Sequence, residues 1–107
     1  MYKLVVFVPE DHAEPVKQAL FSTGAGRFRN YDQASWETRG TGQFRPLAGS
    51  EPYLGSQDQL ERVPELRVEM LCPDEAVRAA IDALLAAHPY EEPAYELYRI
   101  FMQEDLR

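Results

Sequence analysis

A histidine, a tyrosine and two adjacent glutamates stand close together near the end of the chain, between two prolines. The stretch from His88 to Tyr95 reads HPYEEPAY. Histidine and carboxylate side chains transfer protons near neutral pH, and they also bind divalent cations. We therefore expect this stretch to contribute to a ligand site. The expected ligand-binding residues are His88, Tyr90, Glu91, Glu92 and Tyr95.

A second interpretation makes the same stretch a simple connection from a helix to a strand, with polar residues facing water. Pro89 cannot continue a helix, and each proline favours extended geometry in the residue before it. His88 would then end the helix, where the helix dipole favours the protonated imidazole. Glu91 and Glu92 are neighbours on an extended segment, so their side chains point to opposite sides and are not expected to face one substrate together.

Two chemical alternatives to simple ligand binding stay open. In the first, His88 and Glu91 are weak candidates for metal ligands, and a divalent cation would need further ligands from subunits that meet at an axis. The chain has two histidines and no His-x-x-x-His or His-x-His pair, so we predict no metal site and no cofactor. In the second, His88 and a glutamate act as acid and base in a small enzyme. No nucleophile with an obvious base is visible, so we predict no catalytic residue and favour a protein that is not an enzyme.

The composition limits the classes of protein that fit. The chain has 107 residues, 45% of them hydrophobic and 27% charged, which predicts one globular domain over residues 1–107. The net charge of −7 argues against a nucleic-acid partner, and no apolar run is long enough to predict a membrane span. The single cysteine, Cys72, and the lack of a signal-peptide pattern favour a cytoplasmic protein.

The elements that hold the 88–95 stretch follow from the hydrophobic pattern. Residues 2–8 are almost all apolar, which predicts a strand in the middle of a sheet. Apolar residues at helical spacing predict a first helix between Pro9 and Gly24, with Asp11 or His12 as its N-cap. The remaining pattern predicts strands at 31–38, 59–71 and 93–102 and a second helix at 76–87.

The region from Gly24 to Gly55 holds all six glycines of the chain. Within it, residues 41–46 could form a short return strand and make a hairpin around Arg39 and Gly40. The glycines match neither the dinucleotide-binding pattern nor the P-loop pattern. Because functional residues tend to lie on loops held by a rigid scaffold, we add Thr41 and Gly42 to the expected ligand-binding residues. We expect one of them to lie near His88 or Tyr90.

The order of the elements predicts an α+β fold of the ferredoxin-like type. A right-handed split crossover arranges β-α-β-β-α-β as an antiparallel four-stranded sheet with both helices on one face, with an extra short strand possible at 43–46. The other face would carry Val5, Phe7, Leu71 and Tyr98 and would need a cover. A second copy of the chain is the natural candidate, so we expect a homo-oligomer.

Several spaced motifs resemble one family, the Ngg-one-interacting-factor-three-like proteins, also called GTP cyclohydrolase I type 2 homologues. More narrowly, the chain resembles the domain inserted in the middle of longer bacterial members, here as a stand-alone protein. The resemblance implies a fold similar to the CutA and PII signalling proteins, which are usually trimeric. The motifs are GAG at 24–26, NY at 30–31, TGQFRP at 41–46, Gly49, PYLG at 52–55, ERV at 61–63 and HPYEEPAY at 88–95.

The resemblance also limits what is expected of this chain. Full-length members of the family look like dinuclear metal proteins whose ligands lie in the two halves that flank the insert, so that chemistry has no matching residues here. The expected function is a non-catalytic, oligomeric CutA/PII-like module with a regulatory role or a small-molecule or protein partner. The resemblance favours a homotrimer, with a dimer as the alternative.

Overall fold

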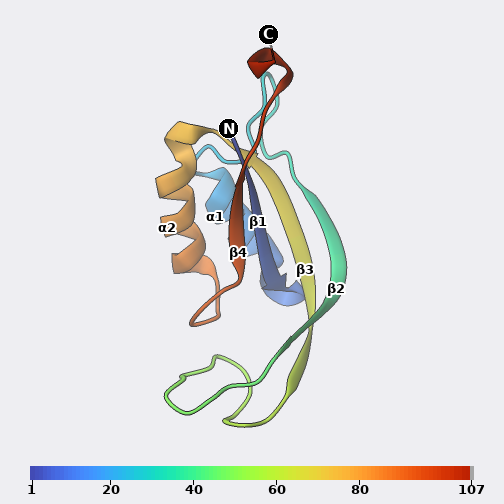
Figure 1. Ribbon diagram of the computed structural model, residues 1–107, viewed down its shortest axis with the longest axis vertical. Helices are drawn as coiled ribbons and strands as arrows, with labels where there is room; N and C mark the ends of the chain where they lie inside the picture. Colours follow the sequence, from blue (N-terminus) through green and yellow to red (C-terminus); the bar gives the residue numbers. More distant parts are fainter. Residues whose placement is uncertain (107) are drawn as a thin grey trace.

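Four antiparallel strands form one sheet in the order β2-β3-β1-β4. The computed structural model describes residues 1–106 (Figure 1). Each main helix connects two strands that lie on either side of a third strand, which is the split β-α-β arrangement of a ferredoxin-like fold. The predicted fold class is confirmed. The strands are β1 (Tyr2–Pro9), β2 (Trp36–Phe44), β3 (Glu61–Cys72) and β4 (Tyr95–Arg99); the helices are α1 (Ala13–Phe21) and α2 (Val77–Ala87), with short 3-10 helices at Glu10–His12, Asp74–Ala76 and Gln103–Asp105.

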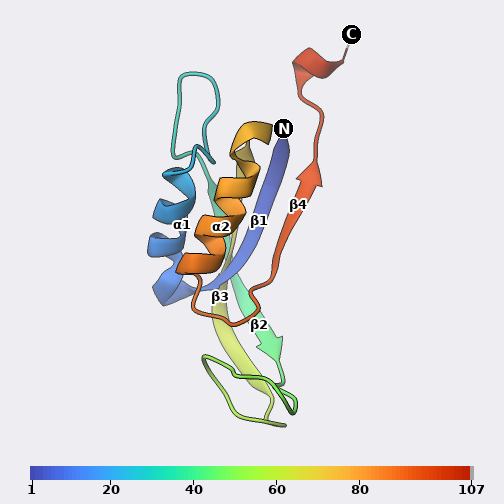
Figure 2. The ribbon, with the colours of Figure 1, turned by 90° about the vertical axis from the view of Figure 1, so that its left-hand side faces the viewer.

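The core lies between the sheet and the two helices, which are on the same side of it (Figure 2). β1 lies inside the sheet, as predicted. It pairs with β3 on one side, from Tyr2↔Cys72 to Pro9↔Glu65, and with β4 on the other side. Alternate β1 side chains enter the core because successive residues of a strand point to opposite faces. The fully buried core includes Leu4, Val6, Val8, Val16, Leu20, Val68, Ala80 and Leu84.

The hairpin predicted around Arg39 and Gly40 is wrong. β2 is one unbroken strand that pairs with β3 along its whole length, from Trp36↔Glu69 to Phe44↔Glu61. Among the described glycines only those at 24, 26, 49 and 55 have a positive φ, so neither glycine of β2 makes a tight turn. Residues 43 and 44 belong to β2 itself, and no extra short strand forms at 43–46 within the described part of the chain.

The ends of several elements also differ from the prediction. His12 occupies the N-cap of α1 but makes no capping hydrogen bond with its side chain, because a 3-10 turn precedes the helix. β2 begins only at Trp36, since residues 28–34 form turns with positive φ at Arg29 and Gln33. β4 ends at Arg99, three residues earlier than expected, and Phe101 beyond it is largely exposed.

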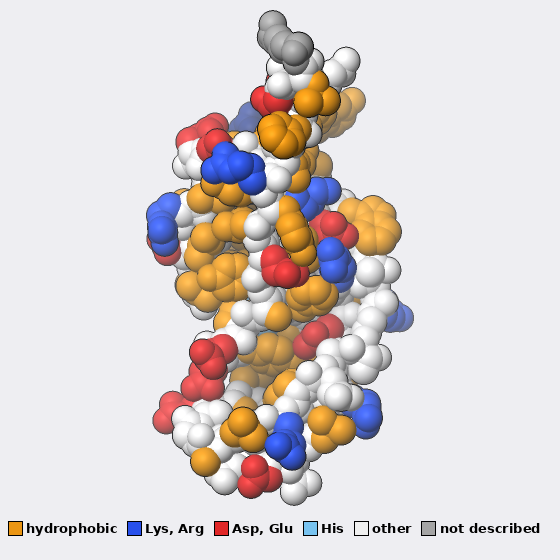
Figure 3. All heavy atoms as spheres, viewed as in Figure 1, with side chains coloured by type: hydrophobic (Ala, Val, Ile, Leu, Met, Phe, Trp, Pro, Cys, Tyr) orange, Lys and Arg blue, Asp and Glu red, His pale blue; other side chains and the backbone are white. Residues whose placement is uncertain are grey.

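The sheet face opposite the helices, called here the open face, carries the side chains that alternate with the core. Val5 on this face is fully buried, whereas Tyr98 is 46% exposed and Trp36 is 61% exposed. The view of Figure 3, in which α1 lies behind the sheet, shows hydrophobic and charged side chains of both signs interspersed on this side. No helix within residues 1–106 has the length and apolar character needed to cross a membrane.

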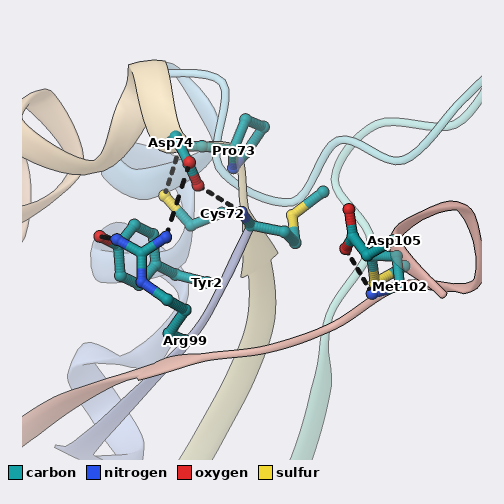
Figure 4. A network of polar contacts seen from close by, with 8 residues as sticks. Tyr2, Cys72, Pro73, Asp74, Arg99, Met102 and Asp105 are labelled. Atoms are coloured by element: carbon teal, nitrogen blue, oxygen red, sulfur yellow. Dashed lines mark hydrogen bonds and ion pairs between the residues drawn. The ribbon is translucent and has the colours of Figure 1, made fainter. Parts of the chain in front are cut away.

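A network of polar contacts joins the end of β4 to the start of α2 (Figure 4). The Asp74 carboxylate pairs with the N-terminal ammonium group of Met1 and lies 4.0 Å from the Arg99 guanidinium. Its hydrogen bond with that ammonium group holds the pKa of Asp74 below its usual value. The Arg99 guanidinium also lies 4.7 Å from the centre of the Tyr2 ring. These contacts connect the first residues of the chain, the last residue of β4 and Asp74 at one end of the sheet.

Candidate functional site

Two loops meet at the opposite end of the sheet, below β1 and β4 in Figure 1. One loop, residues 45–60, connects β2 to β3, and the other, residues 88–94, connects α2 to β4. The Glu91 carboxylate accepts a hydrogen bond from the backbone N–H of Glu51, with N···O distances of 3.1 and 3.2 Å. This contact joins the loop after β2 to the HPYEEPAY stretch.

His88 ties the second loop to the sheet. Its side chain is buried, with Nε2 2.8 Å from the carbonyl oxygen of Phe7 and Nδ1 3.2 Å from the backbone nitrogen of Tyr90. A carbonyl only accepts and a backbone N–H only donates, so the imidazole carries its proton on Nε2 and is neutral. Burial lowers the pKa of His88. The expectation that the helix end favours protonation is therefore wrong, because desolvation outweighs the helix dipole.

Tyr90 forms the centre of an aromatic cluster. Its ring lies 5.7 Å from the Phe44 ring, 6.4 Å from the Tyr53 ring and 5.1 Å from the His88 ring, measured between centroids. Its hydroxyl donates a hydrogen bond to Glu65 Oε2 at 2.9 Å. Burial, with this hydrogen bond to a carboxylate, raises the pKa of Tyr90 well above its usual value. The phenol therefore stays protonated and holds the Glu65 carboxylate in place.

The two loops and the open face enclose a pocket of about 420 Å³, called here the loop pocket. Figure 3 shows this part of the surface hollowed between the body of the sheet and the lower loop. Three carboxylates (Glu65, Glu91 and Glu92) and one cation (Arg45) line it. Most other lining side chains are apolar or aromatic, including Phe7, Phe44, Leu47, Tyr53, Leu54 and Tyr90.

A second hollow of about 500 Å³ adjoins the loop pocket along β2. Thr41 and Gly42 line this hollow, and Glu65 lines both spaces. A Cβ atom at position 42 would collide with the Glu65 carboxylate, so the absence of a side chain there leaves room for Glu65 to reach Tyr90. Gly42 and Tyr90 thus both contact Glu65, which places the predicted pair on either side of one carboxylate.

The predicted site residues therefore divide into three groups. Tyr90, Glu91 and Glu92 line the loop pocket, and Thr41 and Gly42 line the adjoining hollow. His88 lies behind Tyr90 with both ring nitrogens engaged. Tyr95 lies apart from both spaces: it pairs with Val6 on β1 and packs against the core between sheet and helices.

Sequence reasoning missed Glu65 and Tyr53. Glu65 alternates with Arg67 and Glu69 along β3, a pattern that is also typical of a solvent-facing strand surface. Only the register Gly40↔Glu65 and the position of the second loop bury it. The signal for Tyr53 was its place in the PYLG motif of a long loop, since such loops are often functional. Its ring contacts Tyr90 and the His12 ring, the latter with centroids 5.5 Å apart.

Within residues 1–106, no group of three or more His, Cys, Asp and Glu side chains is arranged so that it could hold a metal ion. His88, one of the two weak candidates, has both ring nitrogens in hydrogen bonds with the backbone. Glu91, the other, accepts a hydrogen bond from Glu51. The geometry of the site is that of an acidic, aromatic pocket.

The sequence has clear relatives. A GTP cyclohydrolase 1 type 2 homolog from Halalkalibacterium halodurans is 44% identical over 98 residues, which are 92% of this chain and 26% of that protein. The chain is homologous to a segment of the GTP cyclohydrolase 1 type 2 homologues. It spans about a quarter of the length of these curated relatives. No family model matches the chain.

Solved structures agree with this relationship. A Bacillus cereus protein related to NIF3 matches with a TM-score of 0.77 and 45% identity, over 91% of this chain and 24% of that one. The periplasmic divalent cation tolerance protein CutA from Archaeoglobus fulgidus matches with a TM-score of 0.67 over 99% of this chain and 92% of that one. At 16% identity, the second likeness shows the fold alone. The predicted resemblance and its CutA/PII-like fold are confirmed.

Proposed function

We propose that this chain is a non-catalytic, homo-oligomeric CutA/PII-like module that binds a small ligand in the loop pocket. The observation that carries the proposal is the pocket itself, which forms where the two loops meet over Glu65. Small-molecule sites are typically concave, mostly apolar and equipped with a few polar groups that fix orientation. Because the chain spans only about a quarter of the length of its relatives, the proposal concerns this segment and not the activity of the longer proteins.

Glu92 and Tyr90 are the predicted residues that we assign to ligand contact, with Thr41 and Gly42 at the adjoining hollow. His88 and Glu91 position the loops instead, since their polar atoms already bind the backbone of Phe7, Tyr90 and Glu51. For His88 and Glu91 the acid–base alternative is less favoured, because a general acid or base needs a nitrogen or oxygen that is free to reach the substrate.

A ligand screen on a blocked pocket tests the proposal. Ala94 lines both spaces, so Ala94→Trp should fill them, whereas Ala86→Trp on the exposed side of α2 should leave them open. We expect at least one class among cationic, neutral and anionic small molecules to raise the melting temperature of the wild type and of Ala86→Trp by about 4 °C or more. Ala94→Trp should not respond. Equal responses in all three proteins, or none in any, would contradict the proposal.

The second part of the proposal is that another copy of the chain covers the open face. Trp36 and Tyr98 are exposed there, and cationic and anionic side chains share the same face, among them Arg67 and Glu69 with an N···O distance of 3.3 Å. A face of this composition can match a copy of itself, with rings at the centre and charges at the rim. We propose a homotrimer, with a dimer as the alternative.

A further inference from the structure

Glu65 is a buried carboxylate without a cationic partner. Only 9% of the residue is exposed, and within residues 1–106 its only hydrogen bond comes from the Tyr90 hydroxyl. Arg67, the nearest cation along β3, pairs with Glu69 instead. Burial of a carboxylate is costly unless a positive charge compensates it. The fold therefore holds a carboxylate at the loop pocket that forms no ion pair within residues 1–106.

Aromatic rings surround the space in front of this carboxylate. The Phe44 and Tyr53 rings both lie near the Tyr90 ring, and all three line the loop pocket together with Glu65. The face of an aromatic ring attracts a cation that lies within about 6 Å of its centre, and the attraction grows when water is excluded. Rings around a buried carboxylate are a combination that favours an ammonium or guanidinium group with an apolar body.

The rim of the pocket carries the same sign of charge. Glu91 and Glu92 lie at the edge, against one exposed cation, Arg45. The whole chain has a net charge of −7. Such a field raises the local concentration of cations and lowers that of anions. The volume of about 420 Å³ fits a small organic molecule.

We propose that the loop pocket binds a small organic cation, whose ammonium or guanidinium group pairs with Glu65 while its apolar part lies against Phe44, Tyr53 and Tyr90. This inference rests on the proposed function and names the class of ligand for the same site. The Glu65 oxygen that does not bind Tyr90 accepts the hydrogen bond of the ligand. Glu92 at the rim adds a second carboxylate that the cation can contact.

The test compares two isosteric probes, n-butylguanidinium and the neutral n-butylurea, by calorimetric titration of the purified protein. We expect butylguanidinium to bind at least tenfold more tightly than butylurea. Glu65→Gln keeps an acceptor for the Tyr90 hydroxyl, and it should remove this difference. Glu69→Gln, on the same strand and face but outside the loop pocket, should retain it. Equal affinities in the wild type, or an unchanged preference in Glu65→Gln, would overturn the proposal.

Further variants separate the possible outcomes. Tyr53→Leu should weaken the binding of butylguanidinium about threefold or more and leave the affinity for butylurea nearly unchanged. This variant keeps the proposal testable if Glu65→Gln fails to fold. Tighter binding of a blocked Gly-Arg-Gly peptide than of butylguanidinium would overturn the assignment to a small molecule. If Ala94→Trp blocks a neutral or anionic ligand and butylguanidinium does not bind the wild type, the ligand class is wrong and the proposed function stands.

Discussion

At the scale of single residues, His88 shows how burial decides protonation. The residue follows the last turn of α2 as its C-cap and has an extended backbone conformation. Its ring contacts the carbonyl oxygen of Phe7 on β1. The carbonyl of Phe7 and the N–H of Tyr90 satisfy both nitrogens only in the neutral form. Protonation would add a proton at Nδ1, which has a donor in front of it and no acceptor. His88 thus acts as a positioning residue for Tyr90.

This arrangement predicts a pH dependence of stability. The pKa of His88 is lowered in the folded state, so the unfolded chain binds the proton first as the pH falls below about 6.5. Stability should therefore decrease from about pH 6.5 down to the folded-state pKa. His88→Gln cannot titrate at this position and should show a flatter curve in urea unfolding between pH 7.5 and 5. Parallel curves for the two proteins would show that His88 does not contribute.

At the scale of elements, β2 shows two glycines with different roles. A Cβ atom at Gly40 meets nothing within 4 Å, whereas one at Gly42 collides with the Glu65 carboxylate. Neither residue has a positive φ, so both positions tolerate the backbone of alanine. The difference between them comes only from what lies on the open face of the sheet, and Gly42 keeps space for the contact between Glu65 and Tyr90.

The two glycines form a matched pair for mutation. Gly40→Ala should leave stability unchanged or raise it by up to about 1 kcal/mol, because alanine reduces the freedom of the unfolded chain. Gly42→Ala should lower it by about 1 kcal/mol, because Glu65 must move and its hydrogen bond with Tyr90 is lost. Urea unfolding of both variants measures the difference. A Gly42→Ala protein as stable as Gly40→Ala would contradict this account of the site.

At the scale of the whole molecule, the two ends of the sheet differ in character. One end is closed by the contacts of Asp74 with Met1 and Arg99, and the other carries the two loops and the pocket (Figure 1). Between them the open face presents exposed rings without a cover from the helices. Assembly through this face would leave the loops at their end of the sheet available to a ligand.

Assembly can be tested by light scattering at micromolar concentration. We expect three times the mass of the chain for the wild type, and a shift toward the monomer for Trp36→Glu, because a charge would be buried at the centre of the interface. Tyr31→Glu replaces a ring that is 75% exposed outside the four strands, and it should leave the mass unchanged. A wild-type mass of one chain at low and high salt would mean that the open face faces water.

The sequence by itself determined the class of fold and the place of the central strand. Apolar runs of strand length and helical spacing are local properties, and their order allows few topologies. The sequence also revealed the likeness to the relatives, since each shared motif is a short continuous stretch of residues. The sequence further singled out Tyr90 and Glu92, which line the loop pocket, because prolines and adjacent polar residues mark a loop that does not continue either neighbouring element.

Only the tertiary structure decided the rest. The predicted hairpin failed because β3 is long enough to pair with all of β2, which no local pattern in β2 reveals. From the sequence, Glu65 looks like any outward-facing charge. Strand register pairs it with Gly40 and its carboxylate lies against Gly42, while a loop 25 residues away brings the Tyr90 hydroxyl to it. The charge state of His88 likewise depends on a carbonyl 81 residues distant. These contacts are non-local, so burial and pairing, rather than residue type, give each side chain its role.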